Sequence, residues 1–383
     1  MKYSKYLLAF IILLIIGSSL DAKELRKDIS RTFEISSKGT IEISNSYGNV
    51  FIIESDDDKV HFDIEIIAKG KKEDQLKEAI ERIEIDFSSS ESHISAETEQ
   101  NFKTKWSWGR RTVSFKVVYN IRVPNGLDIE VGNKFGNVDI RSTMDDLYVE
   151  LKYGNLNLAP ITGNAEIRLG HGNGYIQDVE GNLDLDLDYV GSFNIGTIKK
   201  TFDFDCAFSH CDILAISSGN IKSKYSHINI ESANKLEIDS GFDQYKITTV
   251  KEIQIDGKYD KYEIGMSDNF EIDTKFSHIQ INYLSTRGEF DTEYGSVRIK
   301  NLHQDFKQLE IESEFTGYGI GLRGGAKISV ASKYTDVDVP DDTEISFRDR
   351  DGSSLSLKAH YKDPNAGSLI AEMRYGGLKL RGN

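Results

Sequence analysis

Residues 147–158 read LYVELKYGNLNL, and this stretch contains the unit on which most of the chain is built. Apolar and polar residues alternate on both sides of Tyr153, which is the pattern of a β-strand with one buried face. The alternation changes phase at Tyr153-Gly154-Asn155, where glycine and asparagine supply the permissive backbone of a turn. The stretch therefore predicts two short strands joined by a tight corner.

This corner motif recurs along the chain at nearly constant steps. Clear copies begin at Tyr47, Phe135 and Tyr153. Weaker copies begin at His171, Tyr189, Phe208, Tyr225, Phe242, Tyr259, Phe276, Tyr294, Phe315, Tyr334 and Tyr375. From residue 135 to residue 334 the steps are 18, 18, 18, 19, 17, 17, 17, 17, 18, 21 and 19 residues. Steps this regular are typical of a solenoid, in which each unit adds one coil to a stack.

We expect the aromatic side chains to form a ladder inside this stack, because each ring would touch the ring of the coil above and below. The predicted ladder consists of Phe135, Tyr153, Tyr189, Phe208, Tyr225, Phe242, Tyr259, Phe276, Tyr294, Phe315 and Tyr334. The residue two positions before each ring is often small, as at Ser223 and Ser240, and we expect it to leave room for the ring. A β-sandwich or a propeller is the alternative, but a propeller blade needs about 40 residues.

The sequence predicts a mainly β fold, a parallel β-helix or solenoid of ~18-residue coils with a small α/β N-terminal cap. Residues 23–125 form the predicted cap, with a helix over 71–83 and strands at 32–36, 40–44, 50–54, 60–68, 83–87, 92–98 and 113–123. Residues 126–383 form the predicted solenoid, and a degenerate coil is expected around Ser353 to Leu357. Whether Tyr47 belongs to the cap or forms the first coil is left open.

Residues 1–22 have the features of a cleaved secretory signal. Lys2 and Lys5 precede an apolar run over residues 7–16, and small residues precede the expected cleavage after Ala22. An uncleaved anchor is the alternative, although the apolar run is about half of the ~20 residues that a spanning helix needs. We therefore expect an extracytoplasmic protein (periplasmic, at the cell surface or secreted) with no transmembrane segment after cleavage. Its net charge would be 45 − 61 = −16, which disfavours nucleic acid as a partner.

The order of these segments resembles a known group of bacterial envelope proteins. A strand–helix–strand segment is followed by Val123-Pro124-Asn125-Gly126, which leads into repeated strands with corners such as Phe135-Gly136-Asn137-Val138. This arrangement resembles the adhesin-like domains of unknown function found in envelope proteins, over residues 30–383. The resemblance implies an extracytoplasmic β-solenoid and carries over no catalytic residue. Between residues 208 and 276 the chain departs from the pattern, because Ser or Asp replaces the glycine after the ring.

The loop of residues 101–111 is the candidate ligand contact. It combines cationic side chains with both tryptophans of the chain: Lys103, Lys105, Trp106, Trp108, Arg110 and Arg111. Exposed aromatic rings beside cations suit sugar faces and anionic glycans. The alternative is a hairpin whose tryptophans pack on the cap. The expected partner is an envelope glycan or an envelope protein, and the oligomeric state is left open.

No catalytic signature is legible, since the chain has no recognisable nucleophile elbow, phosphate loop or Ser-His-Asp pattern. The sequence therefore predicts a non-enzymatic binding or structural protein of the cell envelope. Two other functions remain open. One is an envelope-stress or signalling accessory that binds a membrane partner, and the other is a polysaccharide-active enzyme.

Neither a cofactor nor a metal ion is predicted. His210, His227 and His278 lie two positions after a ring, where adjacent imidazoles could begin a metal site, but we expect them to be polar corner residues facing solvent. Cys206 and Cys211 could form a disulfide in an oxidising compartment, or could be two small core residues. The acidic clusters lack the spacing of calcium loops and are expected to be charged outer faces: Asp56 to Asp58, Asp145-Asp146, Asp341-Asp342, and alternating Asp184, Asp186 and Asp188.

Overall fold

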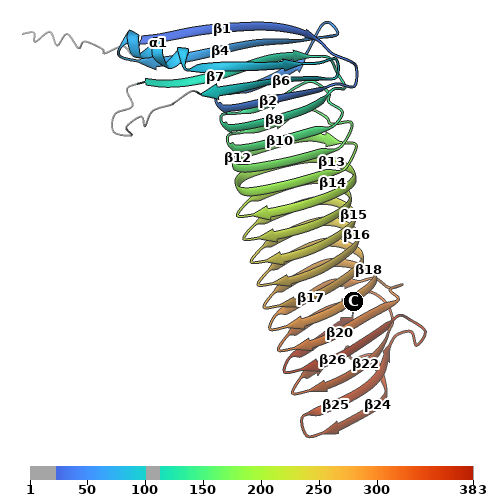
Figure 1. The fold of residues 1–383 in the computed structure, drawn as a ribbon. Coiled ribbons are helices and arrows are strands. Elements are labelled where there is room, and N and C mark those ends of the chain that lie inside the picture. Colours follow the sequence, from blue (N-terminus) through green and yellow to red (C-terminus); the bar gives the residue numbers. More distant parts are fainter. Residues whose placement is uncertain (1–22, 101–112, 383) are drawn as a thin grey trace, which may run out of the picture.

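The structure is a computed structural model that describes residues 23–100 and 113–382. It is a long column of stacked coils with a cap across one end (Figure 1). Strands make up 76% and helix 3% of the structure, and the column is a parallel β-solenoid of about 11 turns with ~18-residue coils. The predicted fold class is therefore confirmed.

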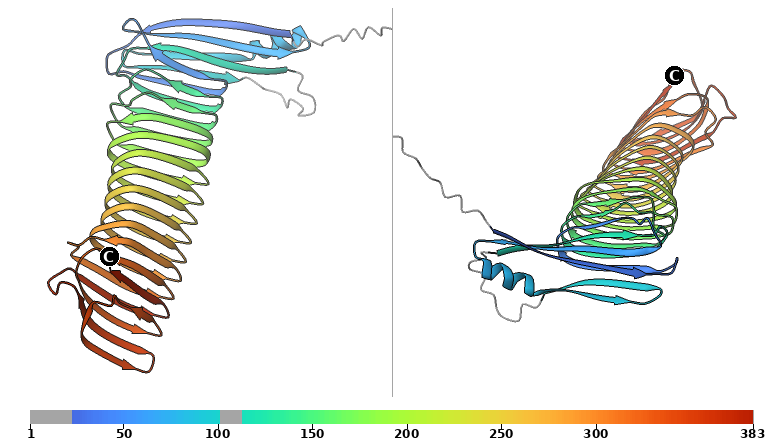
Figure 2. Two further views of the ribbon diagram at one scale, coloured as in Figure 1. Left: turned by 180° about the vertical axis from the view of Figure 1, so that it is seen from behind. Right: turned by 90° about the horizontal axis from the view of Figure 1, so that it is seen from above.

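The N-terminal part contains the helix α1, and some of its strands extend beyond the column (Figure 2). Its elements are β1 (Lys23–Glu34), β2 (Thr40–Tyr47), β3 (Val50–Glu54), β4 (Lys59–Gly70), α1 (Glu73–Glu81), β5 (Ile83–Ser89), β6 (His93–Gln100) and β7 (Val113–Val123). β4 pairs antiparallel with β1 and β7, and β5 pairs antiparallel with β6. The helix turns Leu76, Ala79 and Ile80 into the core, as its 3.6-residue apolar period requires.

β2 and β3 belong to the column although they precede most of the cap in the chain. β2 pairs in parallel with β6 on one side and with a coil strand, β8 (Asp128–Phe135), on the other. β3 pairs in the same way with β7 and with β9 (Val138–Ile140). The Tyr47 ring stacks on that of Phe135, with their centroids 5.1 Å apart. Tyr47 therefore forms the first coil, and β6 and β7 cover its outer edge, which would otherwise expose unpaired backbone.

The middle of the column repeats one pairing scheme from coil to coil. Its further strands are β10 (Leu147–Tyr153), β11 (Leu156–Leu158), β12 (Ala165–Val179), β13 (Leu183–Ala207), β14 (His210–Lys224), β15 (His227–Gly241), β16 (Gln244–Lys258), β17 (Lys261–Lys275), β18 (His278–Glu293), β19 (Ser296–Leu302), β20 (Gln308–Glu314) and β21 (Gly317–Leu322). In-register parallel pairing places equivalent residues side by side, for example Ile228, Tyr245, Tyr262 and Ile279. The alternating apolar residues thus form a continuous core along the column.

The C-terminal end departs from chain order. Its strands are β22 (Ala326–Lys333), β23 (Asp336–Asp338), β24 (Thr343–Asp351), β25 (Ser354–Tyr361), β26 (Ser368–Arg374) and β27 (Gly377–Gly382). β24 and β25 form an antiparallel hairpin, and β25 pairs antiparallel with β22. The expectation of a degenerate coil around Ser353 to Leu357 is therefore wrong. An antiparallel hairpin keeps the same apolar alternation as a coil strand, so the pattern alone does not separate the two.

The aromatic ladder forms a single file from Tyr47 to Tyr334. Successive ring centroids lie between 4.7 and 5.2 Å apart, and their planes differ by at most 17°. The ladder lies outside the core, however, because its Tyr and Phe side chains are between 36% (Tyr47) and 54% (Tyr334) exposed. The expectation of an internal ladder is wrong in this respect.

The corner backbone differs between the coils near the cap and the later coils, although the rings face outward in both. From His171 onward the ring residue itself is left-handed, with φ between 51° at Phe208 and 65° at Phe242. In these coils the ring faces solvent and the next side chain points inward, as at Ser226 and Asp243, which are buried. In the coils of Tyr47 and Phe135 the following glycine takes the positive φ instead.

The inward side chains after the rings form a hydrogen-bonded spine between residues 190 and 277. The backbone N–H of Ser209 donates to Ser226 Oγ at 3.2 Å, and the N–H of Asp243 donates to Asp260 Oδ1 at 2.7 Å. Val190, Ser226 and Asp260 donate in the same way to the next coil. The Ser and Asp residues that replace glycine therefore satisfy buried backbone donors.

At Ser223 and Ser240, the small residue two positions before the ring contacts a core tyrosine and not the ladder ring. Ser223 Oγ lies 2.5 Å from Tyr245 Oη, and Ser240 Oγ lies 2.6 Å from Tyr262 Oη. Both tyrosines are buried and belong to the next coil. At these two positions the small residue makes room for a core tyrosine. The expectation that it leaves room for the ladder ring is wrong, because that ring lies outside the core.

Candidate functional site

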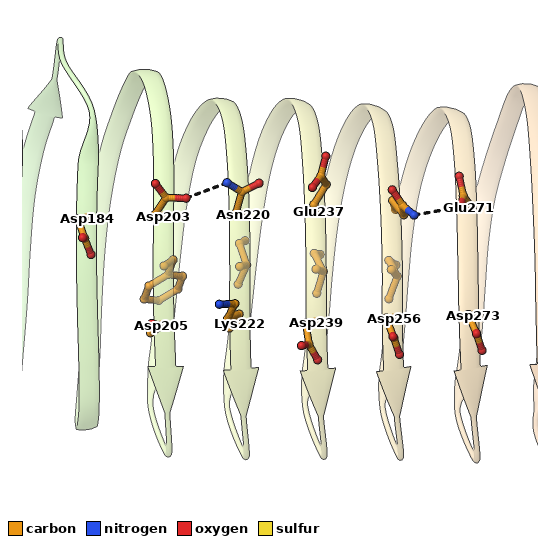
Figure 3. Close-up of a pocket in the computed structure, with 15 residues that line it drawn as sticks. Asp184, Asp203, Asp205, Asn220, Lys222, Glu237, Asp239, Asp256, Glu271 and Asp273 are labelled. Carbon is orange, nitrogen blue, oxygen red and sulfur yellow. Dashed lines mark hydrogen bonds between the residues drawn. The ribbon is translucent and has the colours of Figure 1, made fainter.

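The outer face of β13–β17 carries a long acidic groove (Figure 3). Its volume is about 870 Å³. Its carboxylates and their polar neighbours are Asp184, Asp203, Asp205, Asn220, Lys222, Glu237, Asp239, Gln254, Asp256, Glu271 and Asp273. We call this set the acidic groove.

The solenoid register aligns these side chains in two columns. Asp239 pairs with Asp256, which pairs with Asp273, and Glu237, Gln254 and Glu271 form the second column. Adjacent members are one strand spacing apart, about 4.8 Å. A carboxylate that recurs once per coil in the sequence thus becomes a row of like charges on one surface.

Amide groups and one lysine interrupt these rows. Asn220 Nδ2 donates to Asp203 Oδ1 at 2.8 Å, and Gln254 Nε2 donates to Glu271 Oε1 at 3.0 Å (Figure 3). Lys222 lies in register between Asp205 and Asp239. These neighbours reduce the repulsion between like charges that face each other across strands.

The electrostatics of the face favour uptake of positive charge. Partial burial, followed by repulsion from neighbouring carboxylates, raises the pKa of Asp184. The same two causes raise the pKa of Asp186 and Asp291. A cation placed on the face would relieve this repulsion. Among the described residues, no group of three or more His, Cys, Asp and Glu side chains has the arrangement of a metal site.

The ladder is less suited to binding sugar rings. Each inner ring has both faces covered by its neighbours, as Phe242 does at 4.9 Å from Tyr225 and 4.8 Å from Tyr259. Sugars stack on aromatic faces, and here mainly the ring edges reach solvent. The ladder is therefore better explained as a structural support of the corner.

The other residues singled out from the sequence do not come together. The loop of residues 101–111 lies outside the described residues, so its role as a ligand contact stays a prediction. The rings of His210 and His227 are 6.1 Å apart and tilted, and His210 Nε2 lies 3.2 Å from Asp212 Oδ2. This pairing agrees with polar corner residues.

Cys206 and Cys211 are buried free thiols. Burial raises the pKa of Cys206 to about 11 and that of Cys211 well above its usual value. Neither is a thiolate at neutral pH, so neither has the character of a nucleophile. No bond joins the two sulfur atoms in the structure. A disulfide formed in an oxidising compartment stays a prediction, which a thiol count on denatured, unreduced protein would test.

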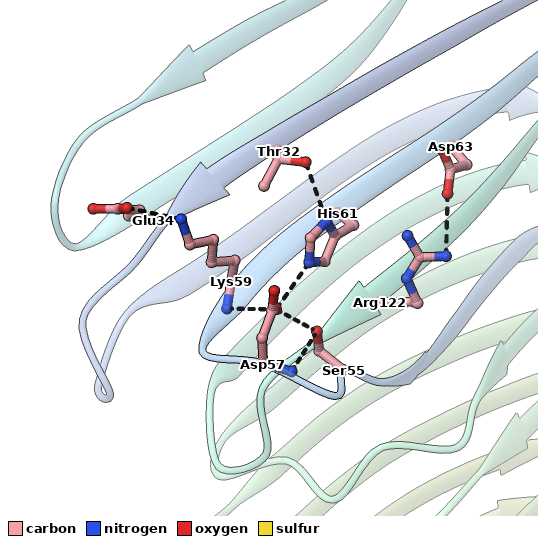
Figure 4. A network of polar contacts seen from close by, with 8 residues as sticks. All are labelled: Thr32, Glu34, Ser55, Asp57, Lys59, His61, Asp63 and Arg122. Carbon is pink, nitrogen blue, oxygen red and sulfur yellow. Dashed lines mark hydrogen bonds and ion pairs between the residues drawn. The ribbon is translucent and has the colours of Figure 1, made fainter.

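The structure also brings together a polar cluster that the spacing in the sequence does not reveal (Figure 4). His61 Nδ1 lies 3.1 Å from Thr32 Oγ1, and His61 Nε2 lies 2.8 Å from Asp57 Oδ1. The bond from His61 is the main cause that lowers the pKa of Asp57. A hydroxyl, an imidazole and a carboxylate in this order can support acyl transfer.

The surroundings of the cluster favour a structural role. Thr32 and Asp57 are exposed, so the arrangement does not exclude water. Asp57 also accepts from Ser55 Oγ at 2.9 Å and from the N–H of Lys59 at 3.1 Å, which closes the turn between β3 and β4. We assign the cluster to the turn and give it no catalytic role.

Residues 39–362 match the protein family described as Toastrack DUF4097. No curated protein matches the chain. In the described part of the chain, no helix is both long and apolar enough to span a bilayer.

Several solved structures are similar at low sequence identity. A candidate cell adhesion protein from Clostridium sporogenes is 10% identical, with 94% of this chain and 100% of that one covered and a TM-score of 0.18. A candidate adhesin from Parabacteroides distasonis is 11% identical, with 76% and 96% covered and a TM-score of 0.29. One from Bacteroides fragilis is 12% identical, with 92% and 97% covered and a TM-score of 0.23. The TM-scores are low, so family membership rests on the match over residues 39–362.

Proposed function

The chain is a member of the Toastrack DUF4097 family, and we propose that it is a non-enzymatic binding or structural protein of the cell envelope. Its location outside the cytoplasm is part of this proposal and rests on the leader expected at residues 1–22. The observation that supports a binding role is the acidic groove, which extends over several coils and is built from the repeat itself.

We propose that the groove binds a cationic partner, namely a basic segment of an envelope protein. Two rows of carboxylates on an elongated surface attract an extended cationic chain through many weak contacts. The same charges repel acidic polysaccharides, which argues against these polymers as ligands or substrates of this face. Because the charges are exposed, the attraction should weaken as salt rises.

A fluorescent oligolysine peptide is a suitable probe for this proposal. The variant D239N/D256N/D273N removes one carboxylate row without changing side-chain size. We expect it to bind the peptide about tenfold more weakly than the wild type in a fluorescence anisotropy titration, since exposed ion pairs contribute about 0.2–1 kcal/mol each. Binding by the wild type should also decrease between low and physiological salt.

The matched control is D58N/D86N/D349N, which removes the same charge from exposed positions outside the groove. It should bind the peptide almost as well as the wild type. Equal losses in the two variants would indicate only a net-charge effect and would refute a specific role of the groove. Incubation with polygalacturonate, followed by an assay for new reducing ends, tests the enzymatic alternative.

We propose separately that the loop of residues 101–111 contacts an envelope glycan. The support is its sequence alone, in which two tryptophans lie among four cations. W106A/W108A should weaken retention on purified cell-wall polymer without changing the urea unfolding midpoint. Unchanged retention would refute this contact.

A further inference from the structure

The C-terminal coil is inserted into the column out of chain order. β26 pairs in parallel with β20 on one side and with β22 on the other, and β27 pairs with β21 and β23. The Tyr375 ring accordingly lies between the rings of Phe315 and Tyr334, at 4.8 and 4.9 Å. Residues 368–382 therefore fill a slot whose two walls were both made earlier in the chain.

The two walls would also fit each other without the insert. Ser368 pairs with Gln308 on one wall and with Lys327 on the other, and Arg374 pairs with Glu314 and Lys333. The walls are thus offset by 327 − 308 = 19 and 333 − 314 = 19 residues, which equals the step between Phe315 and Tyr334. β20 and β22 therefore present parallel edges that are already in solenoid register.

A pair of buried hydroxyls supports this reading of the slot. Ser313 and Ser332 flank Met373 on the two walls, and within the described residues neither Oγ has a hydrogen-bond partner. Equivalent hydroxyls elsewhere in the column do have partners, as Thr292 has in Tyr318 Oη at 2.7 Å. If the walls met directly, Ser313 and Ser332 would become neighbours in one column and could bond to each other.

The insert is held mainly by apolar burial and is attached by a short connection. Its buried side chains are Leu369, Ala371, Met373, Leu378 and Leu380. Arg374 Nη1 lies 3.2 Å from Glu314 Oε1 on one wall, and Arg381 Nη1 lies 2.9 Å from Asp338 Oδ2 on the other. Residues 362–367, which include Pro364, form the only covalent link between the hairpin and the insert.

We propose that this slot is a docking surface for the strand pair of residues 368–382, and that two copies of the chain can exchange this pair to form a dimer. An exchanged insert makes the same contacts as an internal one. The free-energy difference between the exchanged dimer and the monomer therefore depends on the conformation of the connecting residues and on the protein concentration. Exchange between copies is therefore favoured when chains fold at high concentration.

Disulfide trapping between copies tests the exchange. Glu312 and Glu372 are exposed and pair across β20 and β26. Full-length E312C and E372C are mixed, unfolded and refolded together under reducing conditions, and then oxidised. We expect a covalent dimer in at least about tenfold higher yield than in the control mixture, because exchange brings the two thiols together.

The control mixture is E237C with Q254C, which are exposed and paired in the same way between β15 and β16 but lie within the continuous part of the column. The double variant E312C/E372C should form its disulfide within one chain, and this product shows that the geometry permits a bond. A dimer yield no higher than the control, with the internal bond formed, would overturn the proposal. Failure of the internal bond would also overturn it, since the insert would then not lie beside β20.

Discussion

The coils near the cap and the coils in the middle of the column build the same corner with different chemistry. At Gly48 and Gly136 glycine takes the left-handed backbone, and the side chain of Asn137 accepts the N–H of Asn155 in the next coil at 2.9 Å. In the middle, the aromatic residue takes that backbone, and buried Ser and Asp side chains accept the N–H groups. Both kinds of corner therefore keep the ladder ring in an outward position. They differ in which residue takes the left-handed backbone, the glycine after the ring near the cap and the ring residue itself in the middle.

The largest expected effect is the loss of stability when the corner glycine near the cap is replaced by alanine. Gly136 has φ 136°, and an added Cβ would lie 2.1 Å from the carbonyl oxygen of Gly48. G136A should therefore lower the free energy of unfolding by roughly 4 kcal/mol, measured by urea titration. G241A in the middle of the column is the control, because an added Cβ there would lie 4.0 Å from the carbonyl oxygen of Lys258, which is ordinary contact. This variant should change the free energy of unfolding by less than about 0.5 kcal/mol. Similar costs at both positions would contradict the distinction.

The next effect concerns pH and is confined to the middle corners. Burial raises the pKa of Asp243 from its usual 3.8 to about 6, against the hydrogen bonds it accepts from Ser226 and Ser223. A raised pKa favours folding when the group is protonated, so this stabilisation is complete below about pH 3.8 and is lost as pH rises through about 6.

The shift of about two pKa units corresponds to roughly 3 kcal/mol of pH-dependent stability. D243N should remove this contribution, so the difference between wild type and variant should change across pH 4–7 in urea unfolding. D58N, at an exposed site, should keep the wild-type profile. Parallel curves for wild type and D243N would refute the assignment to Asp243.

A smaller effect compares the two kinds of hydrogen-bond acceptor. Ser226 is buried, and its Oγ accepts a hydrogen bond from the N–H of Ser209. In S226A this buried N–H has neither a protein partner nor water, so the variant should lose about 2 kcal/mol of folding stability. Asn137 is only partly buried, so water can replace its side chain and N137A should cost about 1 kcal/mol. Thermal unfolding of the two variants side by side tests this order, and a reversed order would contradict it.

The smallest effect tests the external position of the ladder. Tyr259 is 50% exposed and stacks on Phe242 and Phe276 at 4.8 and 4.9 Å. Y259A should cost roughly 1 to 1.5 kcal/mol, because it loses stacking but opens no cavity. I264A, at a buried position of the same coil, should cost about 2 kcal/mol or more. A larger loss of stability for Y259A than for I264A would contradict the external position of the ladder.

The acidic groove was only partly predictable from the sequence. The alternating Asp184, Asp186 and Asp188 indicate an outward strand face. The rows that run across coils arise from register, since Asp239 and Asp256 are 17 residues apart and become neighbours only through parallel pairing. The cluster of Thr32, Asp57 and His61 depends on antiparallel pairing of β1 with β4, which local patterns do not specify.

The sequence by itself determined the solenoid, because the corner motif recurs every 17 to 21 residues from 135 to 334, and the apolar residues that flank it can be buried only by stacking like on like. It did not determine where the repeat begins, since β2 and β3 lie within the predicted cap but pair with coil strands. Only the tertiary structure decided that the rings face solvent, since the corner backbone reverses the side on which the ring lies without changing the apolar pattern. It also decided that residues 368–382 enter between earlier coils, because equivalent coils have interchangeable edges and chain order does not select among them.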